Sequence, residues 1–427
     1  MNISVVGSGY VGLCTAVGFA SLDNKVIGVD LDQKKVDMIN NGEPPIFENN
    51  LEDMLEKVLK KNMYNATTDL REAIMQTDVT FICVGTPSED DGSIDLIYIE
   101  KASESVGKIL KNKNSFHIVV VKSTVVPQTT EKVVLPILEK ASGKKEGIDF
   151  GICMNPEFLR EGNALGDFLY PDRIVIGALN ERTFKTMENL YKNFNAPILR
   201  VNPRTAEMIK YAANAMLASK ISLINEMGNF CKMIDIDVYD VAKGMGLDKR
   251  IGPHFLSAGV GFGGSCFKKD VMALVAESVK RGHNPKILKK VIDVNEDQPF
   301  KIIEILNKRM DIEGKRIAIL GLSFKAETDD IRESPAIKII NKLLELGAHI
   351  SAYDPKAMEN MKQLFPDIDY FNSVETALKN SDACLILTDW KEFKSLDSEF
   401  DVMKNKIIIE GRKVLDPKKV DFEGVCW

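Results

Sequence analysis

Short apolar runs alternate with longer amphipathic segments through the first part of the chain. With the turns that follow them, the runs are ISVVGSGYVG (3–12), KVIGVD (25–30), TFICVGTP (80–87), FHIVVVKSTVVP (116–127), FGICMNPEFLREG (150–162) and RIVIG (173–177). Uninterrupted apolar runs of this length are typical of parallel strands buried on both faces. A helical pattern, Tyr10–Ser21, lies between the first two runs. This order predicts a doubly wound α/β domain that ends near residue 200.

The pattern changes to helix after Pro203. Residues 206–234 carry apolar side chains at helical spacing with no interior proline, which predicts one long helix. Lys210 and Asn214 lie four residues apart and therefore share a face of it. Further helical patterns extend to residue 310 and are broken by the glycine-rich stretch GVGFGGSCFKKD (259–270).

A second strand–turn–helix–strand unit begins at KRIAILGLSFK (315–325). Its helix covers roughly residues 335–346, and the strand HISAYD (349–354) ends in an aspartate, as KVIGVD does. The strands ACLILTDW (383–390) and NKIIIEGR (405–412) follow. The whole pattern predicts an α/β protein with two Rossmann-like doubly wound domains, 1–200 and 311–427, joined by a central helical domain, 201–310, with a long helix.

The first unit carries a dinucleotide-binding fingerprint. Gly7, Gly9 and Gly12 form G-x-G-x-x-G between a strand and a helix, and Asp30 ends the next strand. The glycines allow backbone N–H groups to approach a pyrophosphate at the helix N-terminus. Asp30 accepts ribose hydroxyls and repels a 2′-phosphate, so the pattern favours NAD over NADP. A tight turn with no ligand is the alternative.

Composition removes several classes of function. The formal net charge of the 427 residues is -6, which with no basic patch argues against nucleic-acid binding. No apolar run approaches the roughly 20 residues needed to span a bilayer, and the N-terminus has no secretory pattern. The seven cysteines are scattered and the four histidines dispersed. We therefore expect a cytoplasmic protein without disulfides or a metal site.

Polar residues at strand ends and one cysteine are candidates for chemistry. Thr86, Thr124 and Glu157 each follow a strand, so topology places them on one rim, although each could instead be a cap or turn residue. Cys266 follows three nearby glycines that remove side-chain bulk around it. We interpret it as a nucleophile that substrate and cofactor can reach, rather than as an inert thiol in a loop.

Together these motifs resemble those of the nucleotide-sugar 6-dehydrogenases, the UDP-glucose/GDP-mannose dehydrogenase family. The resemblance covers nearly the whole chain and rests on VVGSGYVG (5–12), FICVGTP (81–87), KSTVVP (122–127), NPEFLREG (155–162), AEMIKYAANAMLASKIS (206–222), GVGFGGSCFKKD (259–270) and GLSFKAETDDIRESPA (321–336). Asn49 and Asn50 depart from a common Pro-Gly, and Ala326 and Glu327 from a basic–acidic pair. We expect these departures to matter little.

The resemblance implies a four-electron oxidation with two NAD+. It favours UDP-glucose as substrate over UDP-N-acetylhexosamines and GDP-mannose. A bare aldehyde cannot give up a hydride, so a Cys266 thiolate would form a thiohemiacetal, then a thioester that water hydrolyses. A two-electron dehydrogenase of the β-hydroxyacid type and a non-enzymatic NAD-binding protein are the competing hypotheses.

The resemblance also implies residue roles. It assigns catalysis to Cys266, Lys210, Asn214, Asp270, Thr124 and Glu157. It assigns NAD contacts to Gly7, Gly9, Tyr10, Val11, Gly12, Asp30, Lys35, Thr86, Ser123, Thr124, Glu161 and Arg332. It assigns substrate contacts to Glu157, Phe158, Leu159, Arg160, Glu161, Lys210, Asn214, Arg250, Phe255, Leu256, Ser257, Gly263, Cys266, Phe267, Lys325 and Arg412. A homodimer is implied, with Arg250 supplied to the neighbouring subunit.

Overall fold

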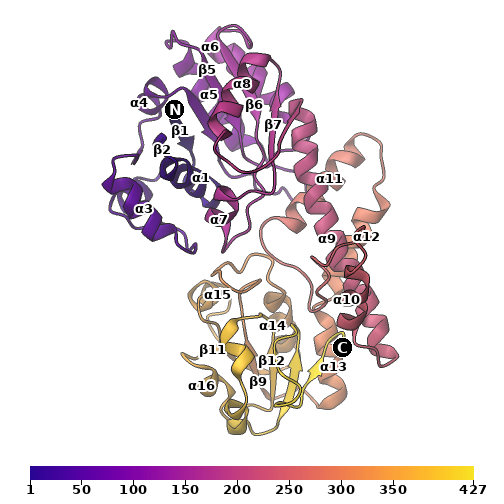
Figure 1. The fold of residues 1–427 in the computed structure, drawn as a ribbon. Coiled ribbons are helices and arrows are strands. Elements are labelled where there is room, and N and C mark those ends of the chain that lie inside the picture. The colour runs from indigo at the N-terminus through magenta and orange to yellow at the C-terminus, as the bar shows by residue number, and fades with distance from the viewer. The chain divides into compact units, whose positions relative to one another are not determined.

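The computed structural model describes residues 1–427, which form two compact units, Met1–Ala213 and Asn214–Trp427. Each unit is built around one sheet with helices packed against it (Figure 1). The two doubly wound sheets that the alternating pattern predicts are therefore confirmed.

The first sheet has eight strands in the order β3-β2-β1-β4-β5-β6-β7-β8. They are β1 (Asn2–Val6), β2 (Lys25–Val29), β3 (Tyr64–Thr67), β4 (Val79–Ile82), β5 (His117–Val121), β6 (Phe150–Met154), β7 (Ile174–Ala178) and β8 (Ile198–Val201). The strands from β3 to β6 pair in parallel. The strand order reverses between β1 and β4, and ligands of open α/β sheets bind at such a switch point.

The direction of β7 differs from a uniformly parallel sheet. Met154 at the end of β6 pairs with Gly177 in β7 antiparallel, whereas β8 is parallel to β7. A parallel connection needs a crossover back to the other edge, usually through a full helix. Only the six-residue helix α7 (Ala164–Leu169) lies between β6 and β7, so the chain enters β7 from the edge where β6 ends.

The helices of the first unit vary in length. They are α1 (Tyr10–Ser21), α2 (Gln33–Asn40), α3 (Leu51–Lys60), α4 (Leu70–Gln76), α5 (Ile97–Leu110), a π-helical turn η1 (Thr130–Val134), α6 (Leu135–Ser142), α7 and α8 (Glu181–Tyr191). The helix α1 is buried from Gly12 to Ala20 because it packs against the sheet and against both α3 and α7. A side chain at Gly18 would place its Cβ 2.2 Å from the Phe168 ring.

The predicted long helix is confirmed as α9 (Pro203–Met233), which has 31 residues. It begins in the first unit and continues in the second. Lys210 belongs to the first unit and Asn214 to the second, one helical turn further along the chain.

The second sheet has six parallel strands in the order β11-β10-β9-β12-β13-β14. They are β9 (Arg316–Leu320), β10 (His349–Tyr353), β11 (Asp369–Tyr370), β12 (Ala383–Ile386), β13 (Ile407–Glu410) and β14 (Glu423–Gly424). In chain order this is the arrangement of the first six strands of the other sheet. The second strand–turn–helix–strand unit that the sequence predicts therefore belongs to a sheet with the same topology as the first.

Helices precede and surround this second sheet. They are α10 (Val238–Gly246), α11 (Phe267–Lys280), α12 (Lys286–Asp297), α13 (Phe300–Arg309), α14 (Pro335–Glu345), α15 (Met358–Leu364) and α16 (Val374–Leu378), with 3₁₀ turns η2 (Lys391–Ser395) and η3 (Ser398–Val402).

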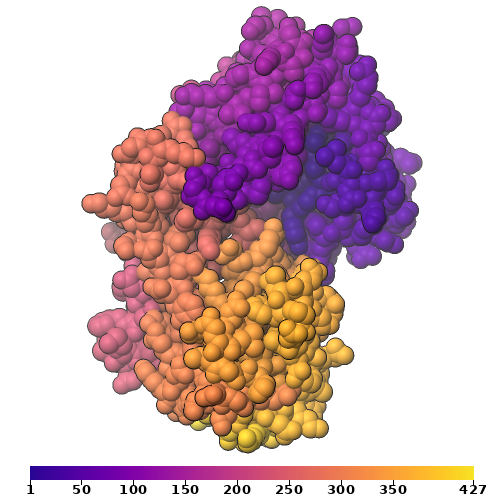
Figure 2. Space-filling view, turned by 180° about the vertical axis from the view of Figure 1, so that it is seen from behind, coloured from indigo at the N-terminus to yellow at the C-terminus, as the bar shows by residue number.

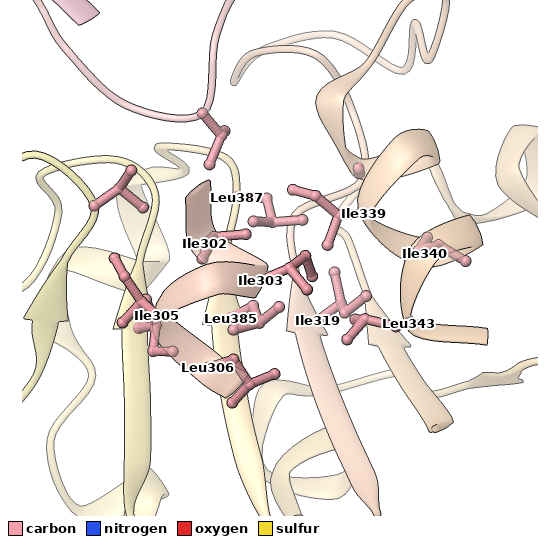
Figure 3. Close-up of a cluster of buried hydrophobic side chains, with 14 of the residues drawn as sticks. Ile302, Ile303, Ile305, Leu306, Ile319, Ile339, Ile340, Leu343, Leu385 and Leu387 are labelled. Atoms are coloured by element: carbon pink, nitrogen blue, oxygen red, sulfur yellow. The ribbon is translucent and has the colours of Figure 1, made fainter. Parts of the chain in front are cut away.

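One apolar core joins α13 to the second sheet. Figure 3 shows Ile303 of α13 beside Ile319 of β9 and Leu306 of α13 beside Leu385 of β12, with Ile339 of α14 near Ile303. In the space-filling view the orange atoms of the helices near residues 286–309 continue into those of the sheet without a break (Figure 2). The helices that precede β9 are thus part of its fold.

A buried polar chain crosses the strands at the amino edge of the first sheet. The Ser4 and Thr80 hydroxyls are 2.7 Å apart, and Thr80 Oγ1 lies 2.7 Å from His117 Nε2. His117 Nδ1 lies 3.1 Å from the Thr77 carbonyl oxygen, which can only accept, so Nδ1 carries a proton. Burial, and then the nearby charge of Lys113, lowers the pKa of His117 to about 3.

This histidine is expected to make the first unit acid-sensitive. The unfolded chain protonates His117 below about pH 6.5 but the folded chain does not, so stability is lost as the pH falls. Because the folded pKa of His117 is about 3, the loss reaches about 2 kcal/mol at about pH 5. Urea unfolding at about pH 7 and pH 5 should show a smaller loss for His117→Gln than for the wild type. The exposed His283→Gln is the control, and an equal loss in all three proteins would contradict the assignment.

Candidate active site

The glycines of the fingerprint serve different purposes. A Cβ at Gly12 would lie 1.8 Å from the Gly7 carbonyl oxygen, and Gly7 itself has a φ of +100°, so both are required by the turn. A Cβ at Gly9 or at Gly85 would meet no atom within 4 Å. Protein packing therefore does not explain these two glycines. The open space in front of the α1 N-terminus fits a dinucleotide pyrophosphate.

Asp30 is fixed by the same turn. Its carboxylate accepts hydrogen bonds from the backbone N–H of Ser8 at 2.8 Å and of Asp32 at 3.1 Å, and the side chain stays partly exposed. Lys35, in the first turn of α2, is half-buried. A partly exposed carboxylate of fixed orientation can still accept ribose hydroxyls.

Asp354, the counterpart of Asp30 in the second sheet, is used differently. It is fully buried, and its carboxylate accepts from the backbone N–H groups of Leu322, Ser323 and Ala357 and from the Trp390 indole N–H. No acceptor face remains open for a ribose. The second unit therefore repeats the topology of the first without repeating its dinucleotide chemistry.

Three neighbouring strands end in the predicted polar residues. Thr86 follows β4, Thr124 follows β5 and Glu157 follows β6, and these strands are adjacent in the sheet. Ser123 donates a hydrogen bond to the Val84 carbonyl oxygen at 2.7 Å and so joins two of the strand ends. Both threonines are half-buried, which leaves their hydroxyls within reach of a ligand.

Glu157 and Lys210 form a buried ion pair. Their charged atoms are 2.8 Å apart, and the two side chains are 6% and 3% exposed. Glu157 also accepts the Leu159 backbone N–H at 2.6 Å. Burial by itself would raise the pKa of Glu157, but the Lys210 ammonium, this N–H and the charge of Lys122 outweigh it, so the pKa of Glu157 is lowered. These contacts favour the ionised form of Glu157.

The segment after Glu157 is held on several sides. The Phe158 ring lies 3.8 Å from the Arg173 guanidinium carbon and 5.7 Å from Lys210 Nζ. Arg160 forms a bidentate ion pair with Asp167 of α7. Leu159 packs at the edge of the apolar core of the sheet. Arg173 was missed by the sequence analysis, and its position after α7 gave no signal.

Two residues of the loop before α3 bind this same segment. Both oxygens of Glu48 accept backbone N–H groups at 2.8 Å, from Gly162 and Ala164, and Asn49 Nδ2 donates to the Gly162 carbonyl oxygen at 2.8 Å. Asn49 is one of the departures from the family pattern. The structure shows that it contacts the loop containing Glu161, which its sequence position did not indicate.

In the second unit, Cys266 stands at the N-terminus of α11. It is half-buried, and its Sγ lies 3.6 Å from Ser265 Oγ. The positive end of a helix favours a negative charge, so the site suits a thiolate. None of the seven cysteines forms a disulfide. Cys266 alone among them is not buried.

Asp270 lies one helical turn after Cys266. Its backbone N–H donates to the Cys266 carbonyl oxygen at 2.9 Å. Its carboxylate accepts from Asn214 Nδ2 at 2.6 Å and from Lys269 Nζ at 2.8 Å, and the residue is 2% exposed. The structure thus brings together three predicted residues, Asn214, Cys266 and Asp270. Lys269 was missed although it lies inside the cysteine motif.

The glycines before Cys266 are required by packing. A Cβ at Gly263 would lie 2.4 Å from the Glu333 carbonyl oxygen, and one at Gly264 would lie 2.8 Å from the Phe324 ring. Packing therefore accounts for these two glycines by itself, and their role in giving access to the sulfur stays a prediction. They allow the cysteine loop to lie directly against the 321–334 loop of the second sheet.

Amide side chains on α9, on α12 and directly after α12 hold the cysteine loop as well. Asn225 accepts the Gly259 N–H, Gln298 donates to the Gly259 carbonyl, and Asn295 both accepts from and donates to the Phe262 backbone. On helices of mixed polarity, the sequence alone would suggest that such amides lie on the surface. Only their burial in the structure shows that they hold the cysteine loop.

Three further residues of the second unit have assigned ligand roles, Lys325 and Arg412 for substrate and Arg332 for NAD. Arg412 donates to the Gly261 carbonyl at 2.7 Å. Arg332 pairs with Asp330 at 2.6 Å, and the Arg332 carbonyl accepts the Gly264 N–H. Lys325 Nζ lies 5.6 Å from the Phe324 ring centroid.

The 250–257 segment lies next to α11. Phe255 has a left-handed φ of +63°, and its ring packs edge-on against Phe267, with centroids 6.1 Å apart. Leu256 is buried and Ser257 is exposed. The Arg250 side chain is 89% exposed and pairs only with Asp248 within its own chain.

The structure contains no cluster of three or more His, Cys, Asp or Glu side chains arranged to hold a metal ion. None of the helices is both long and apolar enough to span a bilayer.

Known proteins share this architecture over the full chain. Family models of the UDP-glucose/GDP-mannose dehydrogenases match residues 1–195 as the NAD binding domain, 204–297 as the central domain and 318–417 as the UDP binding domain. The UDP-glucose 6-dehydrogenase AglM of Haloferax volcanii is 47% identical over 431 aligned residues, which cover 100% of both chains.

Two solved structures extend the comparison. A UDP-glucose dehydrogenase of Pyrobaculum islandicum aligns with a TM-score of 0.95 at 42% identity, covering 100% of this chain and 97% of that one. A UDP-D-ManNAc dehydrogenase of Pyrococcus horikoshii aligns with a TM-score of 0.88 at 30% identity, covering 100% and 99%.

The two kinds of glycine can be separated by mutation. Gly9→Ala should leave the thermal midpoint unchanged, because its Cβ meets no protein atom, but should weaken NAD+ binding at least about tenfold by filling the space at the α1 N-terminus. Titration calorimetry measures this. Gly244→Ala in α10, where a Cβ also meets no atom, is the matched control. Unchanged NAD+ affinity in Gly9→Ala would place the pyrophosphate elsewhere.

Proposed function

Because this chain belongs to the UDP-glucose/GDP-mannose dehydrogenase family, we propose that it oxidises the C6 alcohol of UDP-glucose to the carboxylate of UDP-glucuronate. One turnover consumes two NAD+ and one water. The observation that carries the proposal is the placement of Cys266 at the positive end of α11, one turn before an Asp270 held by Asn214 and Lys269.

The first unit binds the cofactor. NAD+, when bound, accepts one hydride in each of the two oxidations. Gly9 leaves room for its pyrophosphate in the turn that Gly7 and Gly12 shape, and Asp30 and Lys35 hold the adenosine ribose. The remaining contacts come from Tyr10, Val11, Thr86, Ser123, Thr124 and Glu161 of the first unit and from Arg332 of the second.

In the first oxidation the C6 hydroxyl loses its proton and the C6 carbon loses a hydride, which leaves an aldehyde. Lys210 stabilises the negative charge that develops on O6, and Asn214 donates a hydrogen bond to it. Glu157 balances the charge of Lys210 while the site is empty. Thr124 and Glu157 hold the water that accepts the proton.

In the second oxidation the Cys266 thiolate adds to the aldehyde carbon. A C–S bond forms, and the carbonyl π electrons move to oxygen, giving a thiohemiacetal oxyanion. Loss of a second hydride from C6 re-forms the C=O bond and gives a thioester. Water then adds to the thioester, the C–S bond breaks, and Cys266 leaves as thiolate. Asp270, one turn away, positions this water.

The substrate contacts divide by chemistry. Phe158–Gly162 line the path of the sugar diphosphate, and Phe255, Leu256, Ser257, Gly263 and Phe267 form the wall beside the uridine. Lys325 and Arg412 supply positive charge to phosphate or hydrogen bonds to sugar hydroxyls.

A UDP-N-acetylhexosamine or GDP-mannose is the alternative substrate. The Haloferax and Pyrobaculum enzymes named for UDP-glucose are 47% and 42% identical to this chain, whereas the UDP-D-ManNAc enzyme is 30% identical, which favours UDP-glucose. A two-electron β-hydroxyacid-type reaction is less well supported, since it gives Cys266 no role.

We also place the enzyme in the cytoplasm. We propose that the NAD-binding domain ends at residue 200 and that the central helical domain ends at residue 310.

We also infer a homodimer formed through α9. Met216, Leu223, Met227 and Phe230 are exposed at successive spacings of seven, four and three residues, so they form one apolar stripe on the helix. A long helix with such a stripe is completed by a second copy of itself. In that dimer the exposed Arg250 is free to reach the neighbouring subunit's substrate.

NADH yield tests the reaction. Two NADH per UDP-glucose consumed are expected, with no more than trace turnover of UDP-N-acetylglucosamine, UDP-N-acetylmannosamine or GDP-mannose. Cys266→Ser should still allow the first hydride transfer but stall before free UDP-glucuronate is released, because an alkoxide is a poorer leaving group than a thiolate. Absorbance of NADH and chromatography of the sugar nucleotides measure both. One NADH per sugar would contradict the thioester route.

Disruption of the α9 stripe tests the dimer. Leu223→Glu combined with Phe230→Glu should convert the dimer to a monomer, because burying like charges across the interface is costly. Light scattering after gel filtration measures the mass. Ile148→Glu, at an exposed apolar position of the first unit, should stay dimeric.

Complementation tests whether Arg250 acts on the neighbouring subunit. When inactive Cys266→Ala chains are mixed with inactive Arg250→Ala chains, activity should reappear if Arg250 acts across the interface.

A further inference from the structure

Lys122 is a buried cation to which the proposed reaction assigns no role. It directly follows β5, is 4% exposed, and precedes Ser123 and Thr124. Lysine is almost never buried this fully without a paired carboxylate. Here its ammonium instead donates to the Oδ1 and backbone oxygen of Asn155, at 3.0 Å and 3.4 Å. A cation this costly to bury, held by neutral oxygens, is a candidate for a role that depends on its charge and its surroundings.

Asn155 links Lys122 to the end of β6. Its Oδ1 also accepts the Tyr191 hydroxyl at 2.6 Å, and its Nδ2 donates to the Val175 carbonyl at 2.8 Å. Its own N–H donates to the Val121 carbonyl at 2.9 Å. Only Pro156, with its fixed φ, separates Asn155 from Glu157. The position of Glu157 is thus set by the hydrogen bonds of Asn155, of which Lys122 provides two.

The other titratable groups around Lys122 are mostly neutral. Burial raises the pKa of Cys83 on the β4 side and of Cys153 in β6 to about 12, and it raises the pKa of Tyr191 as well. Glu157 is therefore the negative charge that Lys122 meets, and Lys210 the other positive charge. Burial, and secondarily Lys210, lowers the pKa of Lys122, while Glu157 and the two thiols oppose this shift.

We propose that Lys122 is a positioning residue, which holds the Asn155–Glu157 segment and keeps a second positive charge beside the Glu157–Lys210 pair. The proposal rests on the proposed function, in which Glu157 must be ionised and correctly placed. A methionine would fill the same space without the cost of burying an ammonium. The lysine therefore contributes a charge, and removal of that charge should appear in the protonation of Glu157.

Lys113 provides a matched control. It is likewise a buried lysine, 5% exposed, and its ammonium donates to the backbone carbonyls of Ile74, Met75 and Thr77 at the end of α4. It lies at the opposite edge of the sheet from Glu157, since α4 leads into the start of β4. Its removal costs stability without changing the charge beside Glu157.

The experiment compares kcat/KM for UDP-glucose across pH in Lys122→Met, Lys122→Arg and Lys113→Met. In Lys122→Met the fall of kcat/KM at low pH, the acid limb of the profile, should move to a pH about one unit higher, because the Glu157 carboxylate loses a stabilising positive charge. Lys122→Arg should keep the limb in place, and Lys113→Met should lower the thermal midpoint with an unmoved limb. An unmoved limb in Lys122→Met, or an equal shift in Lys113→Met, would overturn the proposal.

Hydrogen exchange separates this proposal from the proposed function. The Leu159 amide is protected by Glu157, so Lys122→Met should speed its exchange in the substrate-free protein, whereas Lys113→Met should not. This readout needs no turnover, so it tests the positioning role even if UDP-glucose is not the substrate. If Lys122→Met does not fold, Lys122→Gln provides the neutral variant, and a shifted limb in Lys122→Arg contradicts the charge argument by itself.

Discussion

The buried ion pair between Glu157 and Lys210 is the constraint on which the first unit's chemistry depends. It ties the segment after β6 to the first turns of α9, with both side chains almost fully buried. Breaking such a pair from one side leaves an uncompensated buried charge, which costs about 3–5 kcal/mol. Neither partner can therefore be exchanged without disturbing the other. The site residues of two distant chain segments are placed before any substrate arrives.

The two sheets show how one topology supports different chemistry. Both have their first six strands in the same order, and in both the second strand leads to an aspartate. The carboxylate of Asp30 stays partly exposed to solvent. The carboxylate of Asp354 instead accepts hydrogen bonds from backbone N–H groups and from an indole N–H. The difference comes from what surrounds each carboxylate. Fold alone would have assigned them the same role.

The sequence pattern was sufficient for the elements whose signals are local. The apolar runs, the glycine fingerprint and the uninterrupted pattern of α9 each depend on residues close in the chain. The direction of β7 was not predictable from its composition, because it depends on how the preceding segment returns to the sheet. The roles of Glu48, Asn49 and Arg173 were missed for a related reason. Their partners lie far along the chain, and nothing in the spacing indicates the contact.

The cysteine motif illustrates the same limit within a site that was recognised. Its residues identified Cys266 and Asp270, but the packing requirement on its glycines was not visible, because the loop's neighbours, Phe324 and Glu333, belong to a different part of the sequence. The contacts of Asn225, Asn295 and Gln298 with this loop were likewise not predictable, since the sequence does not show whether an amide side chain is buried or exposed.

The packing of Gly263 and Gly264 against the 321–334 loop has a consequence for recombination between family members. The UDP binding domain, as the family model defines it, begins at residue 318. This boundary separates the cysteine loop from the 321–334 loop against which it packs, and it separates α13 from the sheet whose core α13 completes. A chimera that exchanged only residues 318–417 would have to keep the position of the Phe324 ring and of the Glu333 backbone, against which Gly263 and Gly264 pack. Donor domains for altered sugar specificity are therefore limited to those whose loop matches this cysteine loop, unless both are transferred together.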